Sequence, residues 1–133
     1  MRVFVAGGTG AVGRPLVQQL VARGHEVTAT TSTPARVGLL EQLGASAAVM
    51  DGLDAASVGE AVAAARPDVV VHLMTSIAAK PDMKHMARWF ATTNRLRTEG
   101  TQHLLAAAGA HGPVREFALV RPTLADIFRE VVR

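Results

Sequence analysis

The segment MRVFVAGGTGAVGRPLVQQLVARGHEV, residues 1–27, decides the fold class of this chain. A short apolar run leads into Gly7, Gly10 and Gly13, spaced three apart, and a helical pattern follows them. A glycine loop between a strand and a helix lets a pyrophosphate approach the backbone with no Cβ in its way. N–H groups at the start of the helix, which carries a partial positive charge there, then bind the phosphate oxygens. The alternative interpretation is a tight turn that binds no ligand.

Short β-branched runs alternate with longer Ala- and Leu-rich helical patterns in the rest of the chain. The Val-Val-Val run at 69–71 has no polar alternation, which is typical of a strand covered on both faces. This order predicts a doubly wound parallel α/β sheet of the Rossmann type, with about five strands, in one domain over 1–133. The predicted strands are 2–6, 26–30, 45–50, 68–73 and 115–120. The predicted helices are 11–23, 34–43, 55–65, a long one within 82–110, and 123–132.

The composition excludes several classes of protein. With 133 residues, 49% of them hydrophobic and 4% aromatic, the chain is long enough for one core of Val, Leu and Ala. The lack of cysteine excludes a disulfide framework and a thiolate nucleophile and fits a reducing compartment. No apolar run approaches the roughly 18 residues of a membrane span, and the first residues do not make a signal peptide. A cytoplasmic location and no membrane partner are expected.

The formal net charge of +3 is mild, but positive side chains are concentrated between residues 80 and 97. They are Lys80, Lys84, Arg88, Arg95 and Arg97. Only Trp89 and Phe90 supply aromatic rings there, too few for stacking on bases. A solvated helix face is therefore preferred over a nucleic-acid interface, which remains the third-ranked function for this chain.

The glycine-rich segment resembles the extended and atypical short-chain dehydrogenase/reductases, the group that includes NAD-dependent epimerase/dehydratase proteins. Gly7, Gly10 and Gly13 match the G-x-x-G-x-x-G spacing of that family. The segment DVVVHLMT at 68–75 is similar to the family's fourth strand, which ends in His-Leu-Ala-Ala. TNRLRTEGTQHLLAAA at 93–108 is similar to its helix in which Asn precedes Gly-Thr and an apolar run. The resemblance covers about residues 1–110.

That resemblance implies a set of residues around a nicotinamide dinucleotide. Thr9, Ala11 and Val12 would line the phosphate loop together with the three glycines. Asp51, followed by Gly52, matches the acid that meets the adenine amino group. An ordinary turn or helix-capping aspartate is the alternative for Asp51.

The same comparison implies three positions near the cofactor ribose, and places one residue of the helical segment near the active site. Leu73, Met74 and Thr75 fall where the family's chain passes the ribose, with Met74-Thr75 in place of a small Ala pair. Asn94 matches a position near the family's active site, with a plain exposed asparagine as the alternative. His72 is interpreted as a strand histidine with satisfied hydrogen bonds rather than a catalytic one.

The second predicted strand indicates which nicotinamide cofactor is bound. A site that prefers NAD carries Asp or Glu at the end of that strand, where it accepts hydrogen bonds from the ribose diol. This chain has Thr31 and Ser32 there, followed by Arg36. Hydroxyls and a guanidinium suit a 2′-phosphate, so NADP is favoured over NAD. An exposed charge on the first turn of a helix is the alternative for Arg36.

The family's proton-transfer residues are missing. The resemblance implies a Tyr four residues before a Lys, yet the chain contains no tyrosine, and Lys80 and Lys84 precede the fifth predicted strand. Thr123 is the remaining candidate, a hydroxyl with no base beside it. We therefore expect a chain that binds NAD(P) without the family's usual catalysis, against the alternative of a non-catalytic dinucleotide sensor or interaction module. The apolar stripe of the predicted helix at 123–132 would dock on a partner chain or a second copy.

Overall fold

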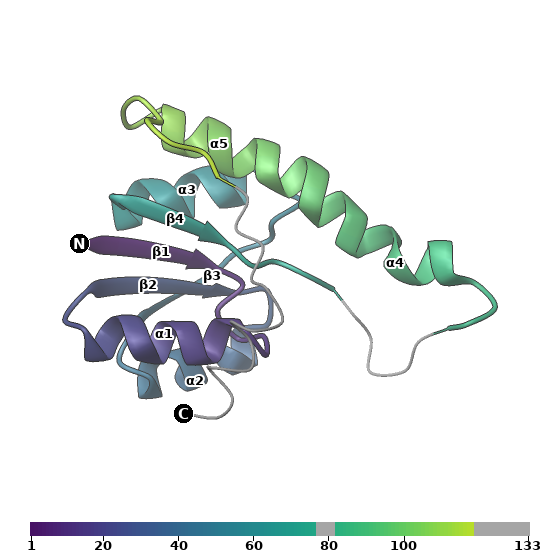
Figure 1. Cartoon of the computed structure of the whole chain (residues 1–133), viewed down its shortest axis with the longest axis horizontal. Helices are drawn as coiled ribbons and strands as arrows, with labels where there is room; N and C mark the ends of the chain where they lie inside the picture. Colours follow the sequence, from purple (N-terminus) through teal and green to yellow (C-terminus); the bar gives the residue numbers. More distant parts are fainter. Residues whose placement is uncertain (77–81, 119–133) are drawn as a thin grey trace.

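The structure, a computed structural model, describes residues 1–76 and 82–118. Its centre is a parallel sheet in the order β3-β2-β1-β4, flanked by helices (Figure 1). The strands are β1 (Arg2–Ala6), β2 (Glu26–Thr31), β3 (Ser46–Val49) and β4 (Val69–His72). The predicted fold class is confirmed: this is a Rossmann-type α/β sheet.

Alternate residues of β1 enter two separate apolar layers. Val3 and Val5 pack in a cluster with Val17 of α1 (Gly13–Ala22) and Leu40 of α2 (Val37–Gln42). Phe4, which is fully buried, packs on the opposite face in a cluster with side chains of α3 (Ala55–Ala65) and α5 (Thr101–Gly109). Figure 1 shows these two helical layers on either side of the sheet. The central strand is therefore buried on both faces, as a doubly wound sheet requires.

One long helical stretch leads from α4 (Met86–Arg95) through a π-helical segment, Leu96–Gly100, into α5. Backbone carbonyls around this junction accept hydrogen bonds from side chains: Thr98 Oγ1 donates to Asn94 O at 3.0 Å and Thr101 Oγ1 to Arg97 O at 2.5 Å. Side chains that bond to helix carbonyls in this way loosen the regular ladder, which accounts for the wider turn.

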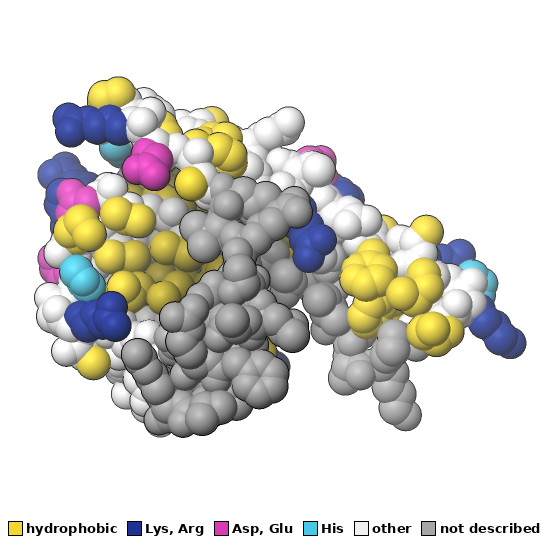
Figure 2. Space-filling view, in the orientation of Figure 1, with side chains coloured by type: hydrophobic (Ala, Val, Ile, Leu, Met, Phe, Trp, Pro, Cys, Tyr) yellow, Lys and Arg dark blue, Asp and Glu magenta, His cyan; other side chains and the backbone are white. Residues whose placement is uncertain are grey.

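Helix α4 extends beyond the sheet (Figure 1). Apolar side chains are exposed at its outer end (Figure 2), where Met83 is 76% and Met86 37% exposed. No helix in the described parts of the chain is both long and apolar enough to cross a bilayer.

The predicted elements agree with the observed ones apart from their ends and the C-terminal region. The predicted helix at 34–43 begins as a 3₁₀ turn, Pro34–Arg36, and the one at 11–23 begins only at Gly13. The strand predicted at 115–120 is wrong over 115–118, which have no regular structure, so the described sheet has four strands. Val114 and Phe117 are exposed, 45% and 68%, so these apolar side chains do not pack on the sheet. The predicted helix at 123–132 lies outside the described residues.

Candidate functional site

The carboxyl ends of β1 and β4 lie side by side where the strand order reverses. The chain passes from β1 to β2 on one side, and returns from β3 to place β4 on the other side of β1. Ligands of open α/β sheets bind in the crevice outside such a reversal. The loops after β1 and β4 touch here: a Cβ on Gly7 would lie 2.8 Å from the carbonyl carbon of Leu73. Gly7 also has φ +90°, a conformation that favours glycine.

The glycine loop leaves backbone donors at the start of α1. Arg14 N–H donates to Gly10 O, Leu16 N–H donates to Val12 O, and Pro15 has no N–H. The N–H groups of Ala11, Val12 and Gly13 have no backbone acceptor among the described residues. No side chain caps this helix end and no acidic residue lies in its first turn. This end of α1 therefore keeps its partial positive charge and its donors for an anion.

The three glycines serve different purposes. A Cβ on Gly13 would lie 2.8 Å from the carbonyl carbon of Gly8, so Gly13 is needed for the close packing of the helix start on the loop. Among the described residues, a Cβ on Gly10 would meet only Gly7 O, at 3.9 Å, and Gly10 is exposed. No described residue therefore fills the space next to Gly10. Arg14, which the sequence analysis did not single out, donates from Nε to Thr9 O at 2.9 Å and lies beside this loop.

Thr30 anchors the loop to β2 and was also missed from the sequence. Its Oγ1 accepts a hydrogen bond from Gly7 N–H at 3.1 Å, and its carbonyl oxygen accepts one from Gly8 N–H at 2.8 Å. Its side chain is only 2% exposed. The sequence shows only that a threonine precedes Thr31; the burial of Thr30 and its bonds to the loop are seen only in the structure.

The end of β2 holds the residues predicted to select the cofactor, in three different environments. Thr31 is buried, and its hydroxyl accepts from Thr33 N–H at 3.1 Å, so it closes a local turn. Ser32 and Arg36 are exposed. Arg36 makes no ion pair with any described residue. The turn that follows β2 therefore carries an exposed guanidinium with no carboxylate partner in the described part of the chain.

Asp51 and Gly52 follow β3. Asp51 is exposed, and its Oδ1 accepts a hydrogen bond from Leu53 N–H at 2.9 Å, as in an ordinary turn, while the capping residue of α3 is Asp54. Gly52 is buried, and a Cβ there would overlap the sulfur of Met74. Gly52 O accepts from a ring nitrogen of His103 at 3.0 Å, which ties this loop to α5.

The loop after β4 sends its side chains in different directions. Leu73 packs on the α1 and α2 face, Met74 is buried on the α3 and α5 face, and Thr75 is exposed. Met74 fits because Gly52 and Gly100 leave room: a Cβ on Gly100 would lie 3.2 Å from the Met74 methyl carbon. The larger side chain that replaces the family's alanine is thus directed into the core.

A buried threonine fixes the same loop to α4. Thr93 has no exposed surface, and its Oγ1 donates to Ser76 O at 2.9 Å and accepts from Ser76 N–H at 3.0 Å. Asn94 is exposed, with its carbonyl oxygen bound by Thr98. The structure therefore uses Thr93, which the sequence analysis passed over, to connect the helix with the loop, and leaves the Asn94 side chain at the surface.

His72 has both ring nitrogens engaged. Nδ1 lies 3.2 Å from Met74 N, whose N–H can only donate, so Nδ1 is the unprotonated acceptor. Nε2 then carries the proton and donates to Leu96 O at 3.1 Å. Burial lowers the pKa of His72, and the bond to Leu96 only partly offsets this. The interpretation of His72 as a strand histidine with satisfied hydrogen bonds is confirmed.

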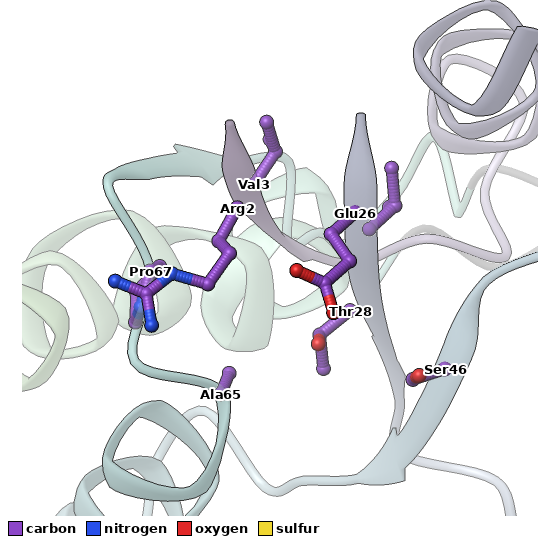
Figure 3. A pocket seen from close by; sticks show the side chains of 8 residues that line it. Arg2, Val3, Glu26, Thr28, Ser46, Ala65 and Pro67 are labelled. Carbon is purple, nitrogen blue, oxygen red and sulfur yellow. The ribbon is translucent and has the colours of Figure 1, made fainter. Parts of the chain in front are cut away.

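A pocket lies apart from the end of the sheet that carries the glycine loop. A small pocket lined by Arg2, Glu26, Ser46 and Pro67 lies at the amino ends of the strands (Figure 3). Because the strands run parallel, this pocket at their amino ends is at the opposite end of the sheet from the glycine loop, which follows the carboxyl end of β1. The described residues contain no cluster of three or more His, Asp or Glu suited to a metal ion. Thr123 lies outside the described residues.

Comparison with known proteins agrees with this geometry. Residues 7–127 match the family described as NAD(P)H-binding. A 3-diazoavenalumate denitrifying reductase from Streptomyces sp. is 48% identical over 115 residues, which are 86% of this chain and 36% of the reductase. A putative epimerase from Burkholderia cenocepacia J2315 is 35% identical, with a TM-score of 0.60 over 80% of this chain and 32% of that protein.

The enzyme WbmG from Bordetella bronchiseptica, solved in complex with NAD, is 26% identical. Its TM-score is 0.64 over 84% of this chain and 34% of WbmG. The chain thus spans about a third of the length of these relatives. The match of the family to most of the chain, together with the glycine loop at the start of α1, settles the assignment: this chain belongs to the NAD(P)H-binding family, with epimerases and a reductase among its relatives.

Proposed function

We propose that this chain holds NADP(H) in preference to NAD(H), with the pyrophosphate on the glycine loop. Binding of the dinucleotide, the first part of this proposal, rests on one observation: the start of α1 is uncapped, and the amides of Ala11, Val12 and Gly13 have no described backbone acceptor. A Cβ on Gly10, in the same loop, would meet no described atom closer than Gly7 O at 3.9 Å. Phosphate oxygens would complete these hydrogen bonds and interact favourably with the helix dipole.

The remaining contacts follow the edge of the sheet. Arg36 would bind the 2′-phosphate, since it is exposed and unpaired among the described residues, and Ser32 would add a hydroxyl. No carboxylate ends β2, so nothing there repels that phosphate. The Oδ2 atom of Asp51 makes no described hydrogen bond and would accept from the adenine amino group. Backbone groups of Leu73 and Thr75 would border the ribose.

The bound nicotinamide would supply or accept a hydride, and the relatives' names indicate reductase and epimerase chemistry for the longer proteins. Within this chain no tyrosine is available to move a proton to or from a substrate oxygen. We therefore place the function of residues 1–133 in cofactor binding and orientation, with hydride transfer dependent on proton-transfer groups that this chain does not supply.

Isothermal titration calorimetry with NADPH, NADH and NADP⁺ tests the proposal. We expect one site per chain, with NADPH bound more tightly than NADH. Absence of heat for all three ligands, from protein shown to be folded by circular dichroism, would overturn it.

A further inference from the structure

Thr30 is a buried residue that accepts hydrogen bonds from two consecutive amides of the glycine loop and so orients both of them. The side chain is 2% exposed, at the carboxyl end of β2. Its hydroxyl accepts from Gly7 N–H at 3.1 Å, and its carbonyl accepts from Gly8 N–H at 2.8 Å. The first two peptide groups of the glycine loop are thereby fixed to the neighbouring strand.

Of these two hydrogen bonds, only the one from Gly7 N–H to the Thr30 hydroxyl depends on the side chain at position 30. The Gly8 bond uses backbone atoms and survives any substitution at position 30, whereas the Gly7 bond needs an acceptor on the side chain. Gly7 has φ +90°, and a Cβ placed on it would lie within 2.8 Å of Leu73 O. The backbone therefore turns sharply at Gly7, where Leu73 leaves no room for a side chain. The hydrogen bond to the Thr30 hydroxyl fixes the direction of the Gly7 N–H.

The direction of that peptide matters for the amides that follow. The loop runs only from Gly7 to Val12 before α1 begins, and Gly13 packs directly against the backbone of Gly7 and Gly8. A shift at Gly7 would therefore move the helix start relative to the loop. Preorganised donors bind more tightly than donors that must first be ordered, because binding then carries a smaller entropic cost.

We propose that the Thr30 hydroxyl is a positioning group for the dinucleotide, which holds the glycine loop in the conformation that receives the pyrophosphate. The proposal rests on the proposed function of NAD(P) binding. It gives a role to a residue that does not itself contact the ligand, and it separates Thr30 from Thr31, whose hydroxyl is used in a local turn with Thr33.

The test compares Thr30→Val, Thr30→Ser and Thr28→Val. Valine keeps the shape of threonine and removes the acceptor, while serine keeps the acceptor. Thr28 is a half-buried threonine on the same strand, lining the pocket at the opposite edge of the sheet, so Thr28→Val is the matched control. We expect Thr30→Val to raise the Kd for NADPH about tenfold, and Thr30→Ser and Thr28→Val to leave it within about twofold.

Amide hydrogen exchange of the unliganded protein supplies a readout that a general loss of stability would not give. In Thr30→Val the exchange of the Gly7 N–H should accelerate selectively, while amides in β1 and β2 keep their protection. If Thr30→Val does not fold, Thr30→Cys, whose thiol is a weak acceptor, is measured in its place. An unchanged Kd in the folded variant overturns the positioning role alone; a wild-type protein that binds no NADPH overturns the proposed function and this inference together.

Discussion

The carbonyl oxygen of Gly7 occupies the space into which a side chain on Gly13 would extend. The Cβ of such a side chain would also lie 2.8 Å from the carbonyl carbon of Gly8, and neither backbone group can move without opening the loop. Gly13 is therefore required by the fold itself. Among the described residues, a Cβ on Gly10, three residues earlier, would meet only Gly7 O at 3.9 Å, so packing within the described part of the fold does not require glycine there.

This difference gives a prediction for Gly10→Val. The variant should fold with nearly wild-type stability, because an added Cβ would meet no described atom closer than Gly7 O at 3.9 Å. It should lose detectable dinucleotide binding, because the side chain would occupy the path of the pyrophosphate. Calorimetry with NADPH and thermal unfolding of the same preparation are the two measurements.

Gly59→Val is the matched control for that variant. Gly59 lies in α3, and a Cβ placed there would meet no described atom within 4 Å apart from its chain neighbours and the backbone of its own helix. The control should bind NADPH as the wild type does. Wild-type affinity in Gly10→Val would mean that the glycine loop is a turn with no ligand against it.

His72 predicts a dependence of stability on pH. Its pKa is lowered by burial in the folded protein, so between that pKa and the ordinary value of about 6.5 the unfolded chain binds the extra proton. The free energy of unfolding is then fully retained above about pH 6.5 and decreases as the pH falls below it. Protonation of Nδ1 would also break its hydrogen bond from Met74 N–H. Urea unfolding at pH 7.5 and pH 5.5 measures the loss.

His72→Gln identifies the source of that loss, because replacing this half-buried imidazole should flatten the pH dependence. Hydrogen bonds from Arg2 lower the pKa of Asp68, and a hydrogen bond from Arg95 lowers the pKa of Glu99. The stability that these two carboxylates add to the folded protein is therefore lost only in more acidic solution, below about pH 4.5. Equal slopes for the wild type and His72→Gln between pH 7.5 and 5.5 would contradict the assignment.

Much of the fold could be predicted because local and global signals agree in this sequence. The unbroken Val run of β4 and the glycines at 7, 24 and 44, all with positive φ in the structure, mark strand and helix ends that tertiary packing did not change. The strand predicted from residue 115 is wrong over 115–118 because Val114 and Phe117 have strand propensity, yet propensity does not specify a partner strand.

The site was harder to predict, since its supporting contacts join residues distant in sequence. The spacing of three glycines identified the loop, but Thr30, 23 residues away from Gly7, holds it through one buried hydroxyl. Thr93 is likewise 17 residues from Ser76. The orientation of Met74 depended on Gly52 and Gly100, which lie near it only in the folded chain. A single sequence gives no direct signal for such pairs.

The preference for NADP(H) is predicted from Arg36. A charge-assisted contact with the 2′-phosphate is worth on the order of 1.5–3 kcal/mol, or about 10- to 150-fold in affinity. NADPH should therefore bind more tightly than NADH, and Arg36→Ala should reduce this difference in affinity between the two cofactors. Arg23→Ala is the control, because Arg23 lies at the C-terminal end of α1, remote from the glycine loop. Equal affinities of the wild type for both cofactors, or an Arg36 variant with unaltered preference, would refute this.

The last prediction concerns turnover. The chain has no tyrosine, and three of its five histidines already have partners: His72 has both ring nitrogens bonded, a ring nitrogen of His103 bonds to Gly52 O, and His85 pairs with exposed Asp82. General acid–base catalysis contributes roughly 10²–10⁴-fold, and substrate orientation can add as much again. Residues 1–133 should therefore bind NADPH and oxidise it negligibly with ketones, aldehydes or nucleotide sugars. NADPH binding measured in the same sample shows that the protein is competent, and oxidation at about 1 per second or faster, the range of ordinary enzymes, would show that another acid supplies the proton.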